Sequence, residues 1–363
     1  PLVVDLDGTL IRTDMLVESA SQFLIQHPFQ FFKPLLWLLR GKTVLKTELA
    51  QRVQIDASAL PYNADLLVWL RAEKLKGRRI VLATASHHIL ADQVAKHLNF
   101  FDEVLATEGD TNLKSTAKAQ LLIERFGEGA FDYVGNDWPD VQVWSAAHTA
   151  HVVDVSASLL ARAQARGNVG LVFKSDKCSK LIAMLKAMRL HQWMKNLLVF
   201  VPLMAAHQYA DASRDLLALM AFVVFSLTAS SVYLLNDVVD VQDDRHHARK
   251  RNRPFASGSL SLIMGWAAWP VLLMMAVVLS TVFMPVLFSA SLCVYFVLTV
   301  AYSLFLKQLA VVDVLTLAAL YTLRIIAGAV AIDVAISFWL LLFSMFIFLS
   351  LALIKRYSEL KDA

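Results

Sequence analysis

The first residues that could do chemistry are two aspartates near the beginning of the chain. Asp5 and Asp7 follow a short apolar run, and Gly8 and Thr9 come after them. Along an extended chain the side chains at i and i+2 lie on the same face, so a strand that ends here brings both carboxylates to one place. One carboxylate can attack phosphorus as a nucleophile while the other handles the proton of the leaving group. A Mg²⁺ ion would neutralise the carboxylate and phosphate charges.

This Asp-x-Asp-Gly-Thr pattern resembles the first motif of the haloacid dehalogenase superfamily of phosphotransferases. The resemblance implies an α/β Rossmann-like haloacid dehalogenase fold with a helical cap. It also implies that Asp5 and Asp7 are the catalytic pair, and that Thr84 contacts the phosphoryl group. Lys114 would balance the phosphate charge, with Lys118 as the alternative to it.

The acidic loop of this superfamily is matched by residues 135–140, with Asp140 as the second carboxylate. The family usually has an aspartate where this chain has Asn136. Asp137 would then substitute for it, or the metal would be held more weakly because the site loses one formal charge. The metal is implied to be Mg²⁺, and its implied ligands are Asp5, Asp7, Asp137 and Asp140.

A second group of chemically capable residues lies in the C-terminal half. Asn236, Asp240 and Asp244 are four residues apart, and at about 100° per residue they stay within about 80° on one helical face. Such acids beside an apolar helix are costly unless cations are bound, and one or two Mg²⁺ ions holding a diphosphate would stabilise them. Lys250 and Arg253 follow and supply cations that pair with phosphate, which a merely solvated acidic loop does not explain.

Together these residues resemble the first aspartate-rich motif of the UbiA superfamily of intramembrane prenyltransferases, which binds Mg-diphosphate. The resemblance adds Asp237 to the metal ligands Asn236, Asp240 and Asp244. Where a second aspartate-rich motif is usual, residues 355–360 carry two cations, which favour phosphate over metal. The substrate-binding residues that the resemblance implies are Lys195, Asn236, Lys250, Arg253, Lys307, Lys355, Arg356 and Glu359.

Arg324 lies deep in an apolar stretch, eleven residues after Asp313. The two fall within about 20° of each other on the same helix face. An arginine inside the membrane is a functional hypothesis by default, so we expect Arg324 to contact substrate phosphate. A structural pairing with Asp313 is the alternative.

The pattern is most similar to one branch of the superfamily, the polyprenyl-phosphate phosphoribosyltransferases. This similarity implies phosphoribosyl diphosphate as donor, a polyprenyl phosphate such as decaprenyl phosphate as acceptor, and Mg²⁺ held by the catalytic Asp240 and Asp244. The N-terminal domain would then remove the 5-phosphate from the lipid-linked product. The alternatives are a prenyltransferase with an aromatic acceptor, and a membrane transporter or scaffold with a catalytically silent cytosolic domain.

Two different kinds of scaffold must position these residues. The chain has 363 residues, of which 57% are hydrophobic and 18% charged, so it is more apolar than an ordinary soluble domain. Residues 1–155 alternate short β-branched runs with helical stretches, which predicts a parallel sheet with crossover helices. Within them, residues 14–63 form a helical insertion, either a cap over an active site or a lid resting on the membrane. Residues 156–188 are predicted as a linker.

From residue 189 to residue 363 the apolar runs predict an all-α polytopic transmembrane bundle. We expect six helices, fewer than the nine usual in the UbiA superfamily, so this domain is predicted to be truncated at its C-terminus. The predicted spans are residues 196–210, 216–235, two within 254–306 divided near Met284 and Pro285, 314–332 and 334–354.

Basic residues predict the orientation of these spans. Nine lysines and arginines flank the spans on the side of the N-terminal domain, and only Arg214 lies opposite. Since no signal peptide precedes the first strand, this predicts a multi-pass protein of a bacterial-type inner membrane whose N-terminal domain is cytoplasmic. The net charge of +4 follows from this topology and implies no nucleic-acid partner. The sequence predicts no oligomeric state.

Overall fold

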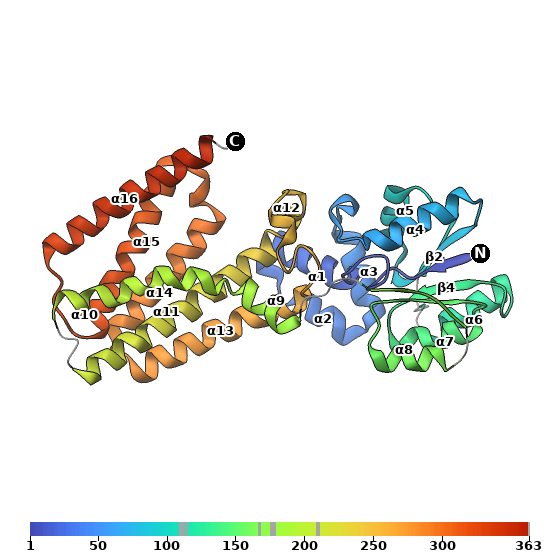
Figure 1. The fold of residues 1–363 in the computed structure, drawn as a ribbon, viewed down its shortest axis with the longest axis horizontal. Helices are drawn as coiled ribbons and strands as arrows, with labels where there is room; N and C mark the ends of the chain where they lie inside the picture. The colour runs from blue at the N-terminus through green and yellow to red at the C-terminus, as the bar shows by residue number, and fades with distance from the viewer. Residues whose placement is uncertain (109–112, 114, 166–167, 175–178, 208–210, 362–363) are drawn as a thin grey trace. The chain divides into compact units, whose positions relative to one another are not determined.

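The computed structural model describes residues 1–108, 113, 115–165, 168–174, 179–207 and 211–361 (Figure 1). The chain divides into two compact units. Unit 1 contains Pro1–Lys180 and Val239–Ile263, and unit 2 contains Leu181–Val238 and Met264–Ala363. Unit 1 therefore joins the N-terminal half of the chain to a segment that lies between two apolar helices in the sequence.

Unit 1 is organised around a six-stranded parallel sheet in the order β3-β2-β1-β4-β5-β6. This confirms the predicted α/β fold. Strand β1 pairs with β2 on one side and β4 on the other, so the strand order reverses at β1. In open parallel sheets, ligands bind beyond the carboxyl ends of the strands at such a reversal. The strands are β1 (Leu2–Val4), β2 (Ile80–His87), β3 (Glu103–Thr107), β4 (Asp132–Gly135), β5 (Ala150–Val153) and β6 (Val169–Phe173).

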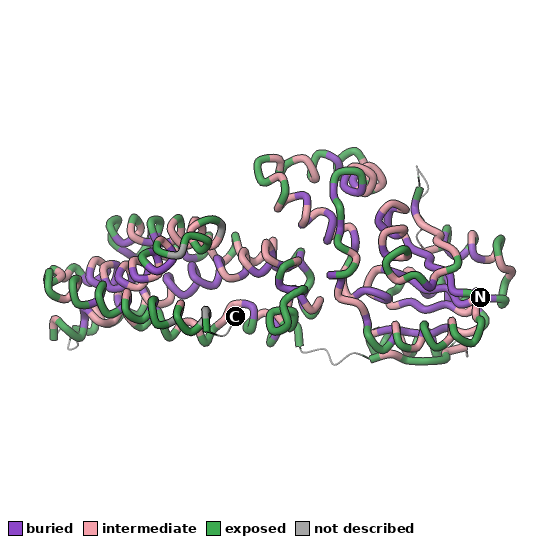
Figure 2. The backbone as a smooth tube through the Cα atoms, turned by 90° about the horizontal axis from the view of Figure 1, so that it is seen from above, coloured by how far each residue is buried: buried purple, intermediate pink, exposed green. Residues whose placement is uncertain are grey.

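Helices cover both faces of this sheet (Figure 1). Leu2 and Val4 of β1 pack toward one face, and Val3 packs toward the other. Figure 2 shows the sheet as the buried centre of unit 1, which explains why its strands are almost continuously apolar. The first face is covered by α4 (Ala64–Leu75) and α5 (His88–Leu98), and the second by α6 (Thr116–Phe126), α7 (Val141–Ala146) and α8 (Ala157–Gln164).

The insertion between β1 and β2 is helical, as predicted for residues 14–63. Asp14 caps its first helix, because its carboxylate accepts hydrogen bonds from the backbone N–H groups of Leu16 and Val17 at 2.8 and 3.2 Å. The elements of the insertion are α1 (Met15–Gln26), η1 (Pro28–Gln30), α2 (Lys33–Arg40), α3 (Lys42–Arg52) and η2 (Ala57–Ala59).

The stretch predicted as a linker, residues 156–188, continues the sheet domain instead. Helix α8 and strand β6 lie within it, and α9 (Lys180–Ala187) follows. Strand β6 pairs in parallel with β5, with Val169 opposite Ala150. It is an edge strand whose side chains are mostly exposed, although its sequence is as apolar as that of β1.

Unit 2 is a bundle of apolar helices, as predicted, but five rather than six of its described helices are long and apolar enough to cross a membrane. The predicted first span, residues 196–210, is not one of them. It contains the end of the 3₁₀ segment η4 (Leu190–Phe200) and the short α10 (Val201–Ala205), while residues 208–210 lie outside the described part. Pro202 has no backbone N–H and lies in the first turn of α10, so it donates no backbone hydrogen bond back to η4. The five are α11 (Ala212–Val239), α13 (Leu262–Phe283), α14 (Val286–Leu304), α15 (Ala310–Ala331) and α16 (Phe338–Lys361).

Helix α15 is central to the packing of unit 2, since η4, α10, α14 and α16 all contact it. At Gly328 a β-carbon would lie 2.1 Å from the carbonyl oxygen of Val199, so glycine alone allows η4 to approach this closely. Phe225, Phe288 and Tyr295 fill the neighbouring core.

Candidate active sites

The two N-terminal aspartates lie at the carboxyl end of β1, between the ends of β2 and β4. Gly8 follows them with φ +72°, and a β-carbon there would lie 2.2 Å from Nδ2 of Asn136. Glycine therefore lets the loop after β1 lie directly against the loop after β4. The Asp-x-Asp-Gly pattern thus encodes a close approach between two loops as well as two carboxylates.

Asp5 is buried and has two close partners. Lys118 donates from Nζ to Asp5 Oδ1 at 2.6 Å, and Thr9 Oγ1 donates to Oδ2 at 3.3 Å. Burial raises the pKa of Asp5 to about 7, against the lowering effect of the Lys118 cation. Lys118 is therefore the lysine that the structure brings to Asp5, whereas Lys114 lies outside the described residues.

Asp7 is held by one backbone group and two hydroxyls. Its Oδ1 accepts from the backbone N–H of Met15 at 2.7 Å, and its Oδ2 accepts from Ser86 Oγ at 2.7 Å and Thr84 Oγ1 at 3.3 Å. Burial, followed by repulsion from Asp14, raises the pKa of Asp7 to about 6. Ser86 was missed by sequence reasoning, although its spacing of two from Thr84 on β2 is the signal for a shared face.

Asp140 and Asp137 both organise the loop after β4. Asp140 Oδ2 accepts from the backbone N–H groups of Asn136 and Asp137 at 2.9 and 3.1 Å, and its Oδ1 accepts from Tyr133 at 2.8 Å. Asp137 is exposed and caps η3 (Trp138–Asp140) through the N–H of Trp138. No hydrogen bond joins Asp137 to Asp5 in the described chain.

Asn136 is linked to Asp5 through Thr9, whose Oγ1 donates to Asn136 Oδ1 at 3.1 Å as well as to Asp5. The described residues contain no ready group of three or more His, Cys, Asp or Glu for a metal. The donors that do converge, the Asp5 carboxylate and the Asn136 amide oxygen, are hard oxygen ligands of the kind Mg²⁺ prefers. With Asp7 and Asp140 nearby, the carboxylates outnumber the Lys118 cation, so the charge of the site also suits a divalent cation.

The second group of predicted residues begins in unit 1, on α12 (Val241–His246) and the 3₁₀ turn η5 (Lys250–Asn252). Asp244 is buried, and Arg253 NH1 lies 2.7 Å from its Oδ2. Burial raises the pKa of Asp244, and the Arg253 guanidinium opposes that shift. Asp240 is half-buried before α12, and Lys250 is exposed. The structure therefore joins Asp244 to Arg253, two residues that the sequence assigned separately to metal and phosphate.

The residue next to Asp244 anchors this segment. Arg245 is buried and forms a bidentate ion pair with Glu18 of α1, with NH2–Oε1 at 2.6 Å and NH1–Oε2 at 3.0 Å. Its Nε donates to the carbonyl of Ala256 at 3.1 Å. His246 also lies 2.8 Å from Asp56. The sequence carries no signal for the Glu18–Arg245 pair, because its members lie 227 residues apart.

In unit 2 a polar cluster joins four helices. Asn236 Nδ2 of α11 donates to Ser303 Oγ of α14 at 2.8 Å. The neighbouring Tyr302 donates to Asp313 Oδ1 of α15 at 2.7 Å, and Arg356 Nε of α16 lies 3.5 Å from Asp313 Oδ2. Two predicted substrate-binding residues, Asn236 and Arg356, are thereby linked through a pair of adjacent residues on α14.

The remaining predicted residues of unit 2 do not join this cluster through the contacts described. Asp237 is buried in an ion pair with Arg189 at 2.5 Å. Lys307 is exposed on η6 (Leu306–Gln308), and Lys195 is exposed with Nζ 5.9 Å from the centre of the Tyr321 ring. The side chains of Lys355 and Glu359 lie outside the described part of α16.

Arg324 is buried, and its contacts are with neutral groups. It donates from Nε to Asn196 Oδ1 at 2.8 Å, from NH1 to the Leu320 carbonyl at 2.6 Å and from NH2 to the Tyr295 hydroxyl at 3.0 Å. The alternative of an ion pair with Asp313 is wrong. Eleven residues of helix separate the two by about 16 Å along the axis, although they share a face.

Comparison with known proteins defines the class. Residues 196–363 match the UbiA prenyltransferase family, and residues 2–127 match the haloacid dehalogenase-like hydrolases. The C-terminal part of the chain is therefore a domain of the UbiA prenyltransferase family, and the N-terminal part is a haloacid dehalogenase-like domain, as the motifs predicted. The chain thus joins a transferase family to a hydrolase family. With its five apolar helices it is a multi-pass membrane protein.

Individual relatives are similar over different lengths. An uncharacterized protein of Sinorhizobium fredii, y4nM, is 37% identical over 99% of this chain and 69% of its own length. The decaprenyl-phosphate phosphoribosyltransferase of Mycolicibacterium smegmatis is 39% identical over 50% of this chain, and the match spans 58% of that protein. A solved structure of a Bordetella pertussis protein of unknown function covers 47% of this chain and 96% of its own, at 17% identity and a TM-score of 0.37. That score is too low to support a functional argument.

Proposed function

We propose that the membrane part transfers a 5-phosphoribosyl group from phosphoribosyl diphosphate to a polyprenyl phosphate in a Mg²⁺-dependent reaction. The observation that carries this proposal is the cation Arg356, which stands where the superfamily usually has acids and pairs with Asp313. A cation there favours a phosphate-bearing ligand over a second metal. The similarity to the decaprenyl-phosphate phosphoribosyltransferase of Mycolicibacterium smegmatis supports the same transferred group and the same class of acceptor.

The proposed reaction needs little from general bases. An oxygen of the acceptor phosphate forms a bond to C1 of the ribose while the bond from C1 to the diphosphate breaks, and diphosphate leaves. The acceptor is already an anion, so catalysis depends on positioning and electrostatic stabilisation. Asp240 and Asp244 would hold Mg²⁺, which when bound draws charge from the leaving diphosphate. Arg253, positioned by Asp244, pairs with phosphate oxygens.

The N-terminal domain, in this proposal, removes the 5-phosphate from the lipid-linked product. Asp5 attacks phosphorus to form an aspartyl-phosphate, and Asp7 gives a proton to the departing ribose oxygen. Water then hydrolyses the aspartyl-phosphate. Lys118 takes the charge-balancing role, and Thr84 and Ser86 hold Asp7 in place. Fusion of the two parts raises the effective concentration of an intermediate that is confined to the membrane.

The excess of basic residues beside the spans supports a location in a bacterial-type inner membrane, with the N-terminal domain on the cytoplasmic side. The same side would then hold both proposed activities.

The test incubates membranes containing the full chain with labelled phosphoribosyl diphosphate and polyprenyl phosphate, followed by analysis of the lipid phase. Label should enter the lipid only with Mg²⁺, and Asp244→Asn should abolish the transfer. Asp243→Asn is the matched control, because Asp243 is exposed on the same short helix. Excess prenyl diphosphate should not compete. Transfer that persists in Asp244→Asn, or competition by prenyl diphosphate, would contradict the proposal.

The second step is tested in the same assay. In Asp5→Asn the first transfer should continue while the phosphorylated lipid accumulates. If the parent protein and Asp5→Asn leave the same phosphorylated lipid, the N-terminal domain does not act on this product.

A further inference from the structure

The insertion of the N-terminal domain carries a large exposed apolar surface. It is formed by η1 and α2, residues 28–40, and is called here the insertion surface. Phe29 is 91% exposed and Leu39 is 78% exposed. Soluble monomers rarely expose contiguous apolar patches of this kind unless the patch binds a protein, a membrane or a ligand. The exposed apolar residues are Phe29, Phe31, Phe32, Leu35, Leu36, Leu38 and Leu39.

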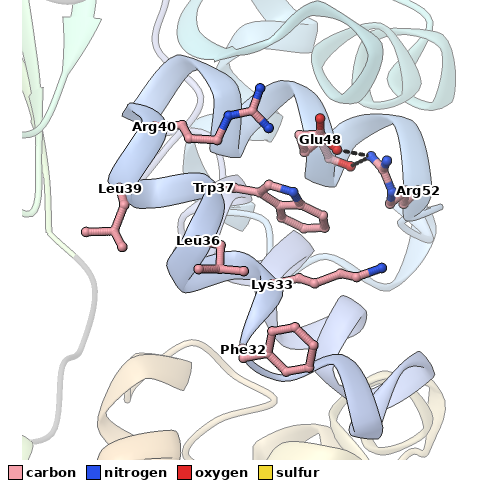
Figure 3. A pocket seen from close by; sticks show the side chains of 8 residues that line it. All are labelled: Phe32, Lys33, Leu36, Trp37, Leu39, Arg40, Glu48 and Arg52. Carbon is pink, nitrogen blue, oxygen red and sulfur yellow. Dashed lines mark hydrogen bonds and ion pairs between the residues drawn. The ribbon is translucent and has the colours of Figure 1, made fainter.

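Helix α2 is held on unit 1 mainly by one side chain. Trp37 is the only buried residue of α2. Its ring packs edge-on against the ring of Phe23 in α1, with 5.1 Å between the ring centres, and the guanidinium of Arg52 lies over the Trp37 ring. Phe32, Leu36 and Leu39 lie at i, i+4 and i+7, so they share one face. Figure 3 shows these residues around an open pocket beside Trp37. The domain therefore anchors α2 but leaves most of its apolar side chains uncovered.

The charge of this segment indicates which kind of partner the insertion surface binds. No Asp or Glu occurs between Glu18 and Glu48, whereas Lys33, Arg40 and Lys42 lie in or next to α2. Amphipathic helices with cations beside exposed Phe and Leu bind anionic bilayer surfaces. Protein interfaces are instead depleted in lysine at their cores.

We propose that the insertion surface binds the surface of an anionic phospholipid bilayer. Its Phe and Leu side chains enter the boundary between headgroups and acyl chains, and Lys33, Arg40 and Lys42 pair with lipid phosphates. The helices of unit 2 tether the domain to a membrane, so a weak interfacial helix suffices to hold it there. This inference does not depend on the reaction proposed above.

The test measures how deeply nitroxide labels lie when the full chain is in lipid nanodiscs. Cys178 and Cys293 are replaced by Ser, and a single label is placed by Leu35→Cys, by Leu39→Cys or, as control, by Leu75→Cys. Leu75 is 89% exposed on α4, away from the insertion surface in sequence. In discs with anionic phosphatidylglycerol, labels at 35 and 39 should collide more with oxygen than with a water-soluble nickel chelate, and the label at 75 should show the reverse.

Charge reversal separates lipid binding from simple burial. The triple variant Lys33→Glu/Arg40→Glu/Lys42→Glu should shift the labels at 35 and 39 toward the nickel chelate. The matched triple Arg71→Glu/Lys76→Glu/Lys96→Glu, on exposed positions of α4, its C-terminal end and α5, should not. Preferential collision with nickel at 35 and 39 in the parent chain would overturn the proposal. Protection from both reagents would also overturn it, because it would indicate that protein covers the surface.

Discussion

The buried pair between Glu18 and Arg245 leads to a quantitative prediction. Their side chains are 1% and 4% exposed, and the carboxylate and guanidinium form two parallel hydrogen bonds. Glu18→Gln keeps the shape of the side chain but leaves the Arg245 charge buried without its counter-ion. Removing one partner of such a pair costs about 3–5 kcal/mol. The loss should destabilise the packing of the segment that carries Asp244 and Arg253 against α1.

That cost predicts a specific change in local opening. At about 1.4 kcal/mol per factor of ten, the opening equilibrium of residues 241–257 should rise by roughly a hundredfold to a few thousandfold. Hydrogen exchange followed by mass spectrometry on the full chain measures it, at amides such as Asp244 and Ser257, which donate to the carbonyls of Asp240 and Arg253. Phosphoribosyl transfer should fall in parallel, because the same segment would hold the donor.

A double variant provides the control for this reasoning. Glu18→Leu/Arg245→Met removes both charges, and apolar replacement of a buried ion pair is often neutral or stabilising. We therefore expect the double variant to exchange more slowly than Glu18→Gln. Unchanged exchange in Glu18→Gln, or faster exchange in the double variant than in the single one, would refute the role assigned to this pair.

Three further predictions concern separate parts of the molecule. Lys118→Met should lower release of the 5-phosphate by about 10²-fold or more while Lys114→Met does not, as measured by phosphate release from the lipid product. Arg324→Leu should insert normally but lose transfer in the membrane assay, and Arg324→Lys should recover only part of it, because lysine lacks the planar fork. Burial lowers the pKa of His151 below its usual 6.5, so the unfolded state gains this proton first and unit 1 should lose stability as the pH falls below about 6.5. Exchange of the Leu171 amide, which donates to His151 Nδ1 at 3.0 Å, reports this loss after correction for intrinsic rates, and a flat profile between pH 5 and 8 would contradict it.

The lysine that pairs with Asp5 shows where prediction from sequence stops. Thr84 and Asp5 could be placed together, because both sit at the carboxyl ends of apolar strands and such ends meet in a parallel sheet. The choice between Lys114 and Lys118 could not be made, because it depends on the turn before α6 and on a contact with Asp5 across 113 residues. Motif order indicated the chemistry, and three-dimensional packing brought Lys118 to Asp5.

In the membrane part, too, the sequence predicted local features but not the contacts between helices. Apolar runs located α11, α13, α14, α15 and α16, since length and hydropathy are local properties of the chain. The periodicity that placed Arg324 on the face of Asp313 was also sound. The shared face did not indicate an ion pair, because Arg324 and Asp313 are about 16 Å apart along the helix axis. Periodicity also could not predict that Asn196 and Tyr295, from other elements, are the neutral partners of Arg324.

By itself, the sequence determined the two families, the parallel sheet, the apolar helices and the positions of the acidic motifs. Each of these depends on patterns within a few turns or strands of the chain. The tertiary structure alone decided which partners those motifs have: Lys118 with Asp5, Arg253 with Asp244, Arg356 with Asp313 and Glu18 with Arg245. Such pairs form between residues brought together only by packing, and a buried charge requires a partner that local periodicity does not specify.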